Sequence, residues 1–425
     1  MKLQTAKGVR DIPPEEKIVR NRMISTLTKV FERYGFAPLE TPIIERFETL
    51  AAKGGAGEGS DAMKEVFTLS DQGERALGLK FEQTTSLCRY VGTNPQIKMP
   101  FKRYEIGPVF RDGPIKAGRY RQFWQCDVDI VGSKSMIADA EVLAITDKVF
   151  KEFGFDFLVK VNNRKVLNGI LAQAGVKEFK NEALIAIDKL EKIGKKGVTD
   201  ELFEGGLNDI QVEKIFEIIK EGLTLEELKS NLTDKDALEG VEELEELFKY
   251  LDAMQIKSAV FDVSLVRGLS YYTGTIFEAY SKKGKITSSL AGGGRYDKMI
   301  GDFLGGSREI PAMGISFGLA PIMDSLKAKE EFKEKSVAKV YVIPIKTVNE
   351  SLDVIQKLRD LGVNADFDIN GRGMSKNLNY ANAMGIPFVI IIGENELKAG
   401  KVLLRDMSSG DQSLLTVEEA AKKLS

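Results

Sequence analysis

The order of strand-like and helix-like segments along the chain is the feature that most constrains its fold. Short alternating segments with polar turns run to about residue 166 and stop, and they return at Ala259–Tyr280, Thr287–Tyr296 and Ile310–Ile322. Strands that follow one another through tight turns are typical of an antiparallel sheet, not of a repeated strand–helix–strand unit. The pattern predicts an α+β fold in which two separate stretches of sequence form one sheet.

Helix and turn signals frame the first stretch. Pro14 and the two acidic residues after it open a segment with apolar residues at helical spacing, so an amphipathic helix is predicted from here to Gly35. Phe36–Ile44 contains two prolines and is predicted to be an edge-type extended segment. Val66–Leu69 and Ala76–Leu79 flank a polar turn and predict a hairpin.

Further strands are expected at Lys102–Glu105, Val109–Arg111 and Gln122–Val131. From Leu167 to Met254 Lys and Glu dominate and apolar residues recur at helical spacing, which predicts a helical insertion.

The tail after a charged linker predicts a compact α/β domain. Strands are expected at Val340–Ile345, Ala365–Ile369, Phe388–Ile392 and Val402–Arg405, and helices at Val348–Leu361 and Ser375–Ala383. The predicted organisation is a catalytic domain in two parts (1–166 and 255–328), an insertion (167–254) and a C-terminal domain (336–425).

Composition excludes several function classes. The chain contains no histidine and two cysteines, which excludes Ser-His-Asp and Cys-His relays and leaves no expectation of a zinc or other protein-held metal site. With 61 Lys plus Arg against 63 Asp plus Glu, no general basic field exists to bind nucleic acid indiscriminately. No apolar run long enough to span a membrane and no signal peptide is found, so a cytoplasmic protein is expected.

The strongest site signal lies around residues 101–131. Phe101–Pro114 and Gly118–Gln125 form a strand, a loop rich in Gly, Pro and cations, and a second strand, which either aims guanidinium groups at a polyphosphate or is a solvated basic hairpin. Gln125, Asp127 and Asp129 alternate with apolar residues and share one face of the second strand. Carboxylates this close repel, so a ligand cleft is favoured.

Three other segments are candidates. Glu82 and Thr84 are expected on one strand face, where they offer partners to an ammonium group; polar alternation on a half-exposed strand is the alternative. Arg267 is followed by Gly268, and Tyr271 and Tyr272 lie between that glycine and Gly274. The tyrosine hydroxyls can hydrogen-bond a polar ring and the guanidinium can neutralise an anionic group; the alternative is a turn with two packing aromatic rings. Three glycines in Ala291–Asp297 permit either close approach to a ligand or a tight turn.

Together these segments resemble the class II aminoacyl-tRNA synthetases, and specifically the histidyl-tRNA synthetase family, over nearly the whole chain. The matching motifs are Lys7–Asp11, the motif 1-like segment from Tyr34 to Pro42, the motif 2-like segments Phe110–Arg111 and Gly118–Gln125, the histidine signature Leu265–Gly274, and the tail with Tyr380–Asn382 and Ile391–Leu397. The signature Arg-Gly-Leu-x-Tyr-Tyr is the most specific of these matches.

The resemblance implies that histidine and ATP, with Mg²⁺, give histidyl-adenylate, and that the histidyl group then passes to tRNA(His). It also implies a homodimer built through motif 1 and anticodon binding by the tail. By position, Arg111, Arg119 and Arg267 match arginines that hold ATP, and Arg111 and Arg267 are the catalytic candidates. The histidine-binding positions match Glu82, Thr84, Gln125, Asp129, Tyr271 and Tyr272.

One departure from the family pattern concerns the pyrophosphate end. Motif 3 usually ends in an arginine, but here Pro321 follows Gly318-Leu319-Ala320, which leaves Arg295 and Arg308 as candidates for that role. The gap keeps open an alternative function, a catalytically inactive synthetase-like subunit that senses histidine and regulates histidine biosynthesis.

Overall fold

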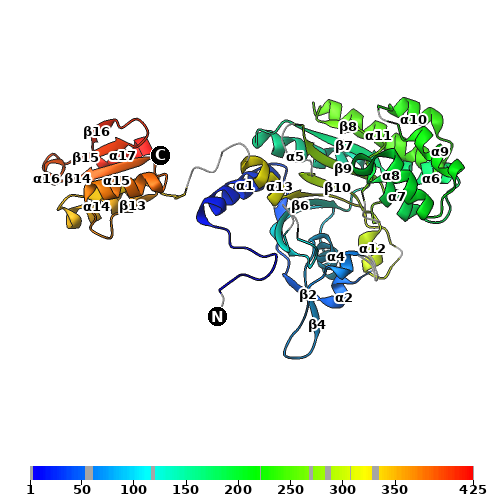
Figure 1. The fold of residues 1–425 in the computed structure, drawn as a ribbon, viewed down its shortest axis with the longest axis horizontal. Coiled ribbons are helices and arrows are strands. Elements are labelled where there is room, and N and C mark those ends of the chain that lie inside the picture. Colours follow the sequence, from blue (N-terminus) through cyan, green and yellow to red (C-terminus); the bar gives the residue numbers. More distant parts are fainter. Residues whose placement is uncertain are drawn as a thin grey trace. The chain divides into compact units, whose positions relative to one another are not determined.

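The computed structural model describes residues 3–52, 61–115, 120–220, 222–267, 271–282, 289–306, 308–327 and 335–424. The chain forms two compact units, one of Met1–Arg10 with Ile24–Ser325 and one of Asp11–Met23 with Leu326–Ser425. Residues 24–325 contain the eight-stranded sheet, and residues 326–425 contain a separate five-stranded sheet (Figure 1). The finer boundaries expected at residues 166, 254 and 328 remain predictions.

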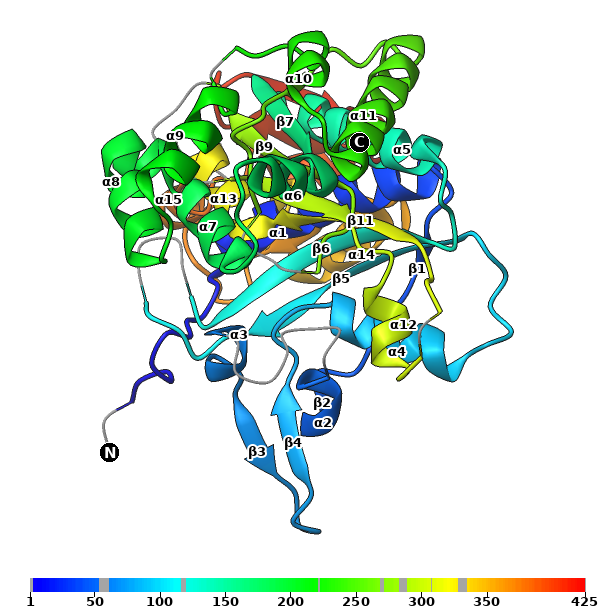
Figure 2. The ribbon, with the colours of Figure 1, turned by 90° about the vertical axis from the view of Figure 1, so that its right-hand side faces the viewer.

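The main sheet of the larger unit has eight strands in the order β1-β5-β6-β11-β10-β9-β7-β8. These strands are β1 (Ala37–Pro38), β5 (Phe101–Phe110), β6 (Gln122–Val131), β11 (Ala312–Gly318), β10 (Ala291–Arg295), β9 (Thr275–Ser281), β7 (Phe157–Asn163) and β8 (Ala259–Phe261). Neighbours are antiparallel except at the two ends, β1 with β5 and β7 with β8. Figure 2 shows the long strands β5 and β6 beside β11. The predicted α+β sheet from two stretches of sequence is confirmed.

One strand prediction is wrong in detail. The segments Lys102–Glu105 and Val109–Arg111 were expected to be two strands, but β5 runs without a break from Phe101 to Phe110. β5 pairs with β6 along one edge and with β1 along the other, but β1 pairs only as far as Tyr104. Pro108 is tolerated because no strand on the β1 side lies opposite it to accept a hydrogen bond from a backbone N–H. Arg111 lies just beyond the strand, where its backbone N–H donates to the Arg121 carbonyl at 2.8 Å.

A smaller sheet of β2 (Ile44–Arg46), β4 (Ala76–Leu79) and β3 (Thr68–Ser70) contains the predicted hairpin. Three short helices lie near it in sequence, α2 (Phe47–Leu50), α3 (Asp61–Lys64) and α4 (Thr84–Thr93).

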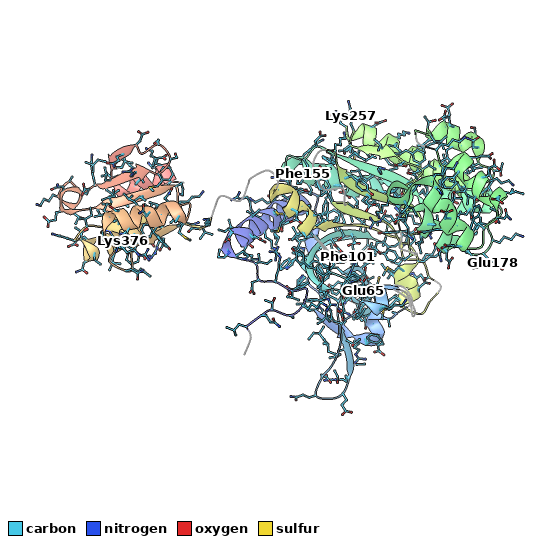
Figure 3. All side chains as sticks on the ribbon, viewed as in Figure 1. Glu65, Phe101, Phe155, Glu178, Lys257 and Lys376 are labelled. Atoms are coloured by element: carbon cyan, nitrogen blue, oxygen red, sulfur yellow. The ribbon has the colours of Figure 1, made fainter. Side chains whose placement is uncertain are left out.

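Helix α5 (Met136–Glu152) and the part of α1 (Pro14–Arg33) from Ile24 onward pack on one face of the main sheet. Phe31 and Phe150 place their rings 5.7 and 5.9 Å from the ring of Phe317 on β11. Phe155, labelled in Figure 3, adds a ring 6.0 Å from that of Phe150. Since successive strand residues alternate between faces, the residues next to Phe317 point to the opposite face, where a cavity lies.

Between β7 and β8 the described residues form helices only, as predicted for 167–254. They are α6 (Arg164–Gln173), α7 (Lys180–Ile187), α8 (Leu190–Glu204), α9 (Asp209–Ile218), α10 (Leu225–Asn231) and α11 (Lys235–Ala253). The stripe Leu244, Leu247 and Leu251 of α11 is buried. Two further helices, α12 (Met299–Phe303) and α13 (Leu319–Lys327), flank β11 in sequence.

The tail is an α/β unit with the sheet order β13-β12-β14-β15-β16. Its strands are β12 (Val340–Pro344), β13 (Ala365–Phe367), β14 (Phe388–Ile392), β15 (Val402–Asp406) and β16 (Gln412–Leu415); its helices are α14 (Val348–Asp360), α15 (Met374–Ala383), α16 (Glu394–Lys398) and α17 (Val417–Leu424). All six predicted elements are present. β16, α16 and α17 were missed, although Thr416 and Glu419 cap α17 reciprocally, a signal visible in the sequence.

Candidate active site

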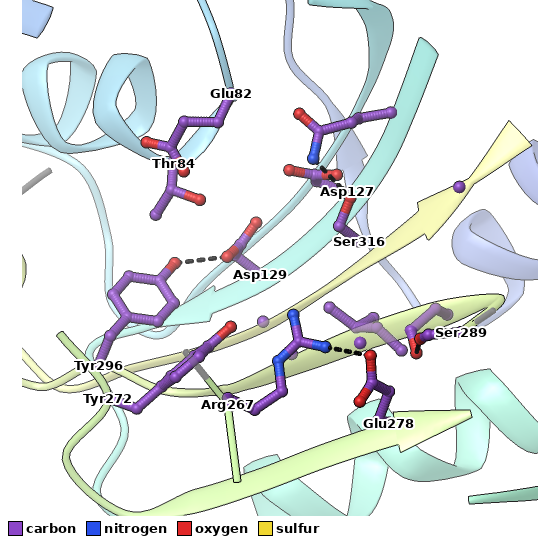
Figure 4. Close-up of a pocket in the computed structure, with 18 of the residues that line it drawn as sticks. Glu82, Thr84, Asp127, Asp129, Arg267, Tyr272, Glu278, Ser289, Tyr296 and Ser316 are labelled. Atoms are coloured by element: carbon purple, nitrogen blue, oxygen red, sulfur yellow. Dashed lines mark hydrogen bonds and ion pairs between the residues drawn. The ribbon is translucent and has the colours of Figure 1, made fainter. Parts of the chain in front are cut away.

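A cavity of about 430 Å³ lies on the open face of the main sheet (Figure 4). Eight of the nine predicted site residues line it, namely Glu82, Thr84, Arg111, Gln125, Asp129, Arg267, Tyr271 and Tyr272. Arg119 lies outside the described residues. Sequence reasoning placed Asp127 on the cleft face without giving it a role, and it did not assign Glu278, Tyr296 and Ser316 to the site, although all four line the cavity.

Strand β6 supplies the polar floor of the cavity. Gln125, Asp127 and Asp129 all line it, while Cys126 and Val128 between them are fully buried, so the predicted division of this strand into two faces is confirmed. The side-chain amide of Gln125 donates to the Ser316 hydroxyl at 3.0 Å.

Beside this floor, on the same face of the neighbouring strand β5, lies a buried ionic network that the sequence analysis missed. Arg103 on β5 is fully buried, and its guanidinium lies 2.8 Å from a carboxylate oxygen of Asp129. The ammonium of Lys80 lies 2.8 Å from Glu105, the next residue on the same face of β5. Burial raises the pKa of Asp129 and Arg103 opposes this rise. Arg103 and Glu105, two residues apart and therefore on one face of β5, were the available signal.

Asp129 also accepts a hydrogen bond from the hydroxyl of Tyr296. Each of its carboxylate oxygens therefore already has a neighbour within the protein, Tyr296 on one and Arg103 on the other. The chain positions this carboxylate firmly before any ligand arrives.

The expectation that Glu82 and Thr84 share a strand face is wrong. β4 ends at Leu79, and Thr84 is the first residue of α4. The Glu82 carboxylate caps this helix by accepting from the backbone N–H of Thr85 at 2.9 Å, and from its hydroxyl. Both Glu82 and Thr84 still line the cavity, from a helix start and not from a strand.

Arg267 lies across β10 on the opposite wall. Its guanidinium donates to Glu278 at 2.8 Å. Burial disfavours the charged form of Arg267, but Tyr272 and Glu278 outweigh it and raise the pKa, so the guanidinium stays positively charged. The rings of Tyr271 and Tyr272 pack with their centroids 4.7 Å apart beside it.

The glycines of β10 make room for these side chains. A Cβ added to Gly292 would lie 2.1 Å from Nη1 of Arg267, and one added to Gly294 would lie 2.8 Å from the Tyr272 ring. The three glycines thus lie within a strand and not in a turn, and Gly292 and Gly294 permit close approach by protein side chains. Close approach to a ligand stays a prediction.

Replacing Gly292 by alanine is expected to displace the guanidinium of Arg267 while leaving the fold intact, because the clashing atoms are the far end of a flexible side chain. We expect turnover in any reaction that uses Arg267 to fall by about 10- to 100-fold, with a melting temperature within about 3 °C of the unchanged protein. Turnover equal to that of the unchanged protein would show that the position of Arg267 is not critical.

Arg111 joins this cavity to a second one. Its Nε donates to the Phe81 carbonyl at 3.0 Å, and its guanidinium carbon lies 5.3 Å from the ring centre of Phe123. The second cavity has a volume of about 220 Å³. Its lining includes Arg111, Phe123, Tyr120, Trp124 and Pro321. Its walls are largely aromatic or apolar.

The expectation that Arg295 holds a pyrophosphate group is wrong. Its side chain is 4 % exposed, and it pairs with Asp139 and, at 3.3 Å, with Asp297. It also donates to the backbone carbonyls of Ser133 and Ser135. Arg308 lines neither cavity. The guanidinium groups of described residues that do line them are those of Arg111 and Arg267.

The antiparallel sheet, whose open face holds arginines and carboxylates, and the α/β unit fit a class II aminoacyl-tRNA synthetase. Residues 8–322 match the family model for histidyl-tRNA synthetase, and residues 339–425 match that for an anticodon-binding domain. A histidine–tRNA ligase of Bacillus cereus is 41 % identical over 97 % of this chain and 95 % of its own length. The chain belongs to the histidyl-tRNA synthetase family.

Solved structures agree with this assignment. The histidyl-tRNA synthetase of a Nostoc species has a TM-score of 0.87 and 32 % identity, covering 100 % of this chain and 99 % of its own. A Bacillus halodurans protein titled both ATP phosphoribosyltransferase regulatory subunit and histidyl-tRNA synthetase has a TM-score of 0.76 over 89 % of this chain and 96 % of its own. At 20 % identity that second likeness shows the fold alone, so the regulatory alternative is not favoured.

Among the described residues, no helix is both long and apolar enough to cross a membrane.

Proposed function

We propose that this chain activates histidine with ATP to form histidyl-adenylate and pyrophosphate, and then transfers the histidyl group to the terminal ribose of tRNA(His). The observation that carries the proposal is that eight side chains chosen from the sequence, from distant parts of the chain, line one cavity. Both steps move negative charge on phosphate groups, and preorganised guanidinium groups are well suited to stabilise it.

Arg111 and Arg267 are the proposed catalytic residues. They approach the cavity from different elements, Arg111 from the end of β5 and Arg267 from the segment before β9. Two fixed cations at one cavity can hold the substrate carboxylate and the α-phosphate in the geometry of attack. Arg119 is proposed to join them on ATP by its position in the sequence alone.

Polar groups around the rest of the cavity fit the two ends of histidine. We assign the α-amino group to Glu82, Thr84 and Gln125, and the imidazole ring to Asp129 and Tyr272 with Tyr271 beside them. The assignment is supported by their shared cavity and by the fixed orientation of Asp129 between Arg103 and Tyr296.

ATP is proposed to extend from Arg111 into the apolar second cavity beside Phe123, whose ring can stack on a base. Mg²⁺ would accompany the triphosphate. Among the described residues no three Asp, Glu, His or Cys side chains group to hold a metal. We propose that the ion is held mainly through the substrate phosphates, because both oxygens of Glu278, the cavity carboxylate beside Arg267, already accept hydrogen bonds from Arg267 and Tyr280.

The tail is proposed to bind the anticodon of tRNA(His), as its family match suggests. A homodimer is proposed through the segment around β1. This strand ends the order of the main sheet, and the nearby Ile43 and Ile44 are 41 and 52 % exposed. We further propose that the protein works in the cytoplasm.

The activity is tested by charging purified tRNA(His) with radioactive histidine, and by histidine-dependent exchange of pyrophosphate into ATP. We expect exchange without tRNA, and charging when tRNA(His) is added. A regulatory subunit would bind histidine with neither activity, and that result would refute the proposal.

A further inference from the structure

Asp127 is a cavity carboxyl group to which the proposed histidine site gives no role. It is 4 % exposed and lies between Gln125 and Asp129 on β6. Its Oδ1 is buried and has no hydrogen-bond partner in the protein, and the same holds for Oε1 of Gln125. Two adjacent unpartnered acceptors inside a cavity are costly unless a ligand supplies donors.

The buried cations beside Asp127 are already matched by other carboxylates. Lys80 pairs with Glu105 and Arg103 with Asp129, both at 2.8 Å. If Asp127 is also ionised, three carboxylates face two cations in this network. Asp127 is thus the carboxyl group for which the network supplies no cation of its own.

Ser316 on β11 lies directly opposite Asp127 in the sheet register. Its hydroxyl accepts from Nε2 of Gln125 at 3.0 Å and so fixes the orientation of that amide. Oε1 of Gln125 and Oδ1 of Asp127 are left for another donor.

Glu82 faces the same space from the start of α4, close enough to repel Asp127. Burial raises the pKa of Asp127 to about 8, and the carboxylates of Asp129 and Glu82 add to this rise while Arg103 opposes it. A compact cation placed between Glu82 and Asp127 would relieve that repulsion. An ammonium group has three donors, so adding Asp127 to Glu82, Thr84 and Gln125 means that two of these four acceptors share one donor.

We propose that Asp127 is a further substrate-binding residue, which accepts a hydrogen bond from the α-ammonium group of the amino acid. This inference rests on the proposed function, since it takes histidine as the ligand of the cavity. It gives the ammonium group a second carboxylate in addition to Glu82.

The test compares two ligands that each lack one end of histidine. Histidinol keeps the ammonium and imidazole groups, whereas 3-(imidazol-4-yl)propanoate keeps the imidazole and carboxylate groups but has no ammonium. Calorimetric binding to the full-length Asp127→Asn variant should weaken about 10- to 100-fold for histidinol and change by less than about 2-fold for the propanoate. Equal weakening of both ligands, or of neither, would overturn the inference.

Asp129→Asn is the matched control, the same substitution two residues further on the same face. It should weaken both ligands, because both carry the imidazole ring. Histidine-dependent pyrophosphate exchange by the unchanged protein tests the proposed function separately. Absence of exchange would refute the proposed function, whereas an Asp127→Asn variant that weakens both ligands equally would refute only the role of Asp127.

Thermal unfolding without ligand provides a second measurement. The raised pKa means that the folded state holds a proton on Asp127 that the unfolded state releases above its ordinary pKa, so this residue lowers stability increasingly as the pH rises from about 4 to 8. The groups facing it are Arg103 and Glu105 from β5, Asp129 from β6, Glu82 and Ser316. Asp127→Asn should therefore melt at a higher temperature than the unchanged protein, with a larger difference at pH 8 than at pH 5. A less stable variant would contradict the inference.

Discussion

Replacing Arg267 by alanine is expected to reduce histidine-dependent ATP–pyrophosphate exchange by about 1,000-fold or more. The guanidinium is held by Glu278 at 2.8 Å and lies across β10 at the cavity, where negative charge develops on the α-phosphate. Steady-state exchange at saturating histidine and ATP measures the effect. The loss should appear in kcat more than in KM, because the interaction strengthens in the transition state.

Two variants serve as controls for Arg267→Ala. Arg267→Lys keeps a positive charge but loses the planar fork, so an intermediate rate is expected. Arg308→Ala removes an arginine that lines neither cavity and should leave exchange unchanged. If Arg267→Ala retained exchange within about threefold of the unchanged protein, Arg267 would have no part in adenylation.

Replacing Arg103 by methionine is expected to lower the free energy of unfolding by about 3–5 kcal/mol. Arg103 is fully buried, and its loss leaves the carboxylates of Asp129 and Glu105 with less compensating charge. Urea unfolding followed by the fluorescence of Trp124, the single tryptophan, measures the change. Histidine binding should fall as well, because Asp129 loses the group that orients it.

A second substitution distinguishes lost charge balance from lost packing in the Arg103 variant. Adding Asp129→Asn removes the unpaired carboxylate and should recover part of the lost stability. Lys148→Met, which breaks a surface pair with Glu152 at 3.0 Å, should cost less than about 1 kcal/mol. A cost for Arg103→Met as small as that of Lys148→Met would show that the buried pair contributes little.

Much of the site was predictable because side-chain direction on a strand is a local property. Alternation alone placed Gln125, Asp127 and Asp129 on one face of β6, and the cavity lies on that face. The element types of the tail followed from periodicity in the same way. The histidine signature identified Arg267 and the two tyrosines, which line the same cavity.

The alternation of polar and apolar residues gave a wrong prediction at residues 82–84, which form the start of a helix and not a strand. Glu82 and Thr84 alternate as strand residues do, but β4 ends at Leu79, and the Glu82 carboxylate accepts from the backbone N–H of Thr85 in the first turn of α4. Alternation over three residues cannot separate these two structures, because a cap residue also has extended or irregular backbone.

By itself, the sequence determined which residue types were available for chemistry, the split of the sheet around a helical insertion, the faces of its strands, and the family. Only the tertiary structure decided which charges meet. Arg295 matched a functional expectation, yet the fold buries it against Asp139. Arg103 and Lys80 neutralise Asp129 and Glu105 and leave Asp127 without a cation, because strand register brings together residues from distant segments. The energy of a buried charge depends on those neighbours, which no local pattern specifies.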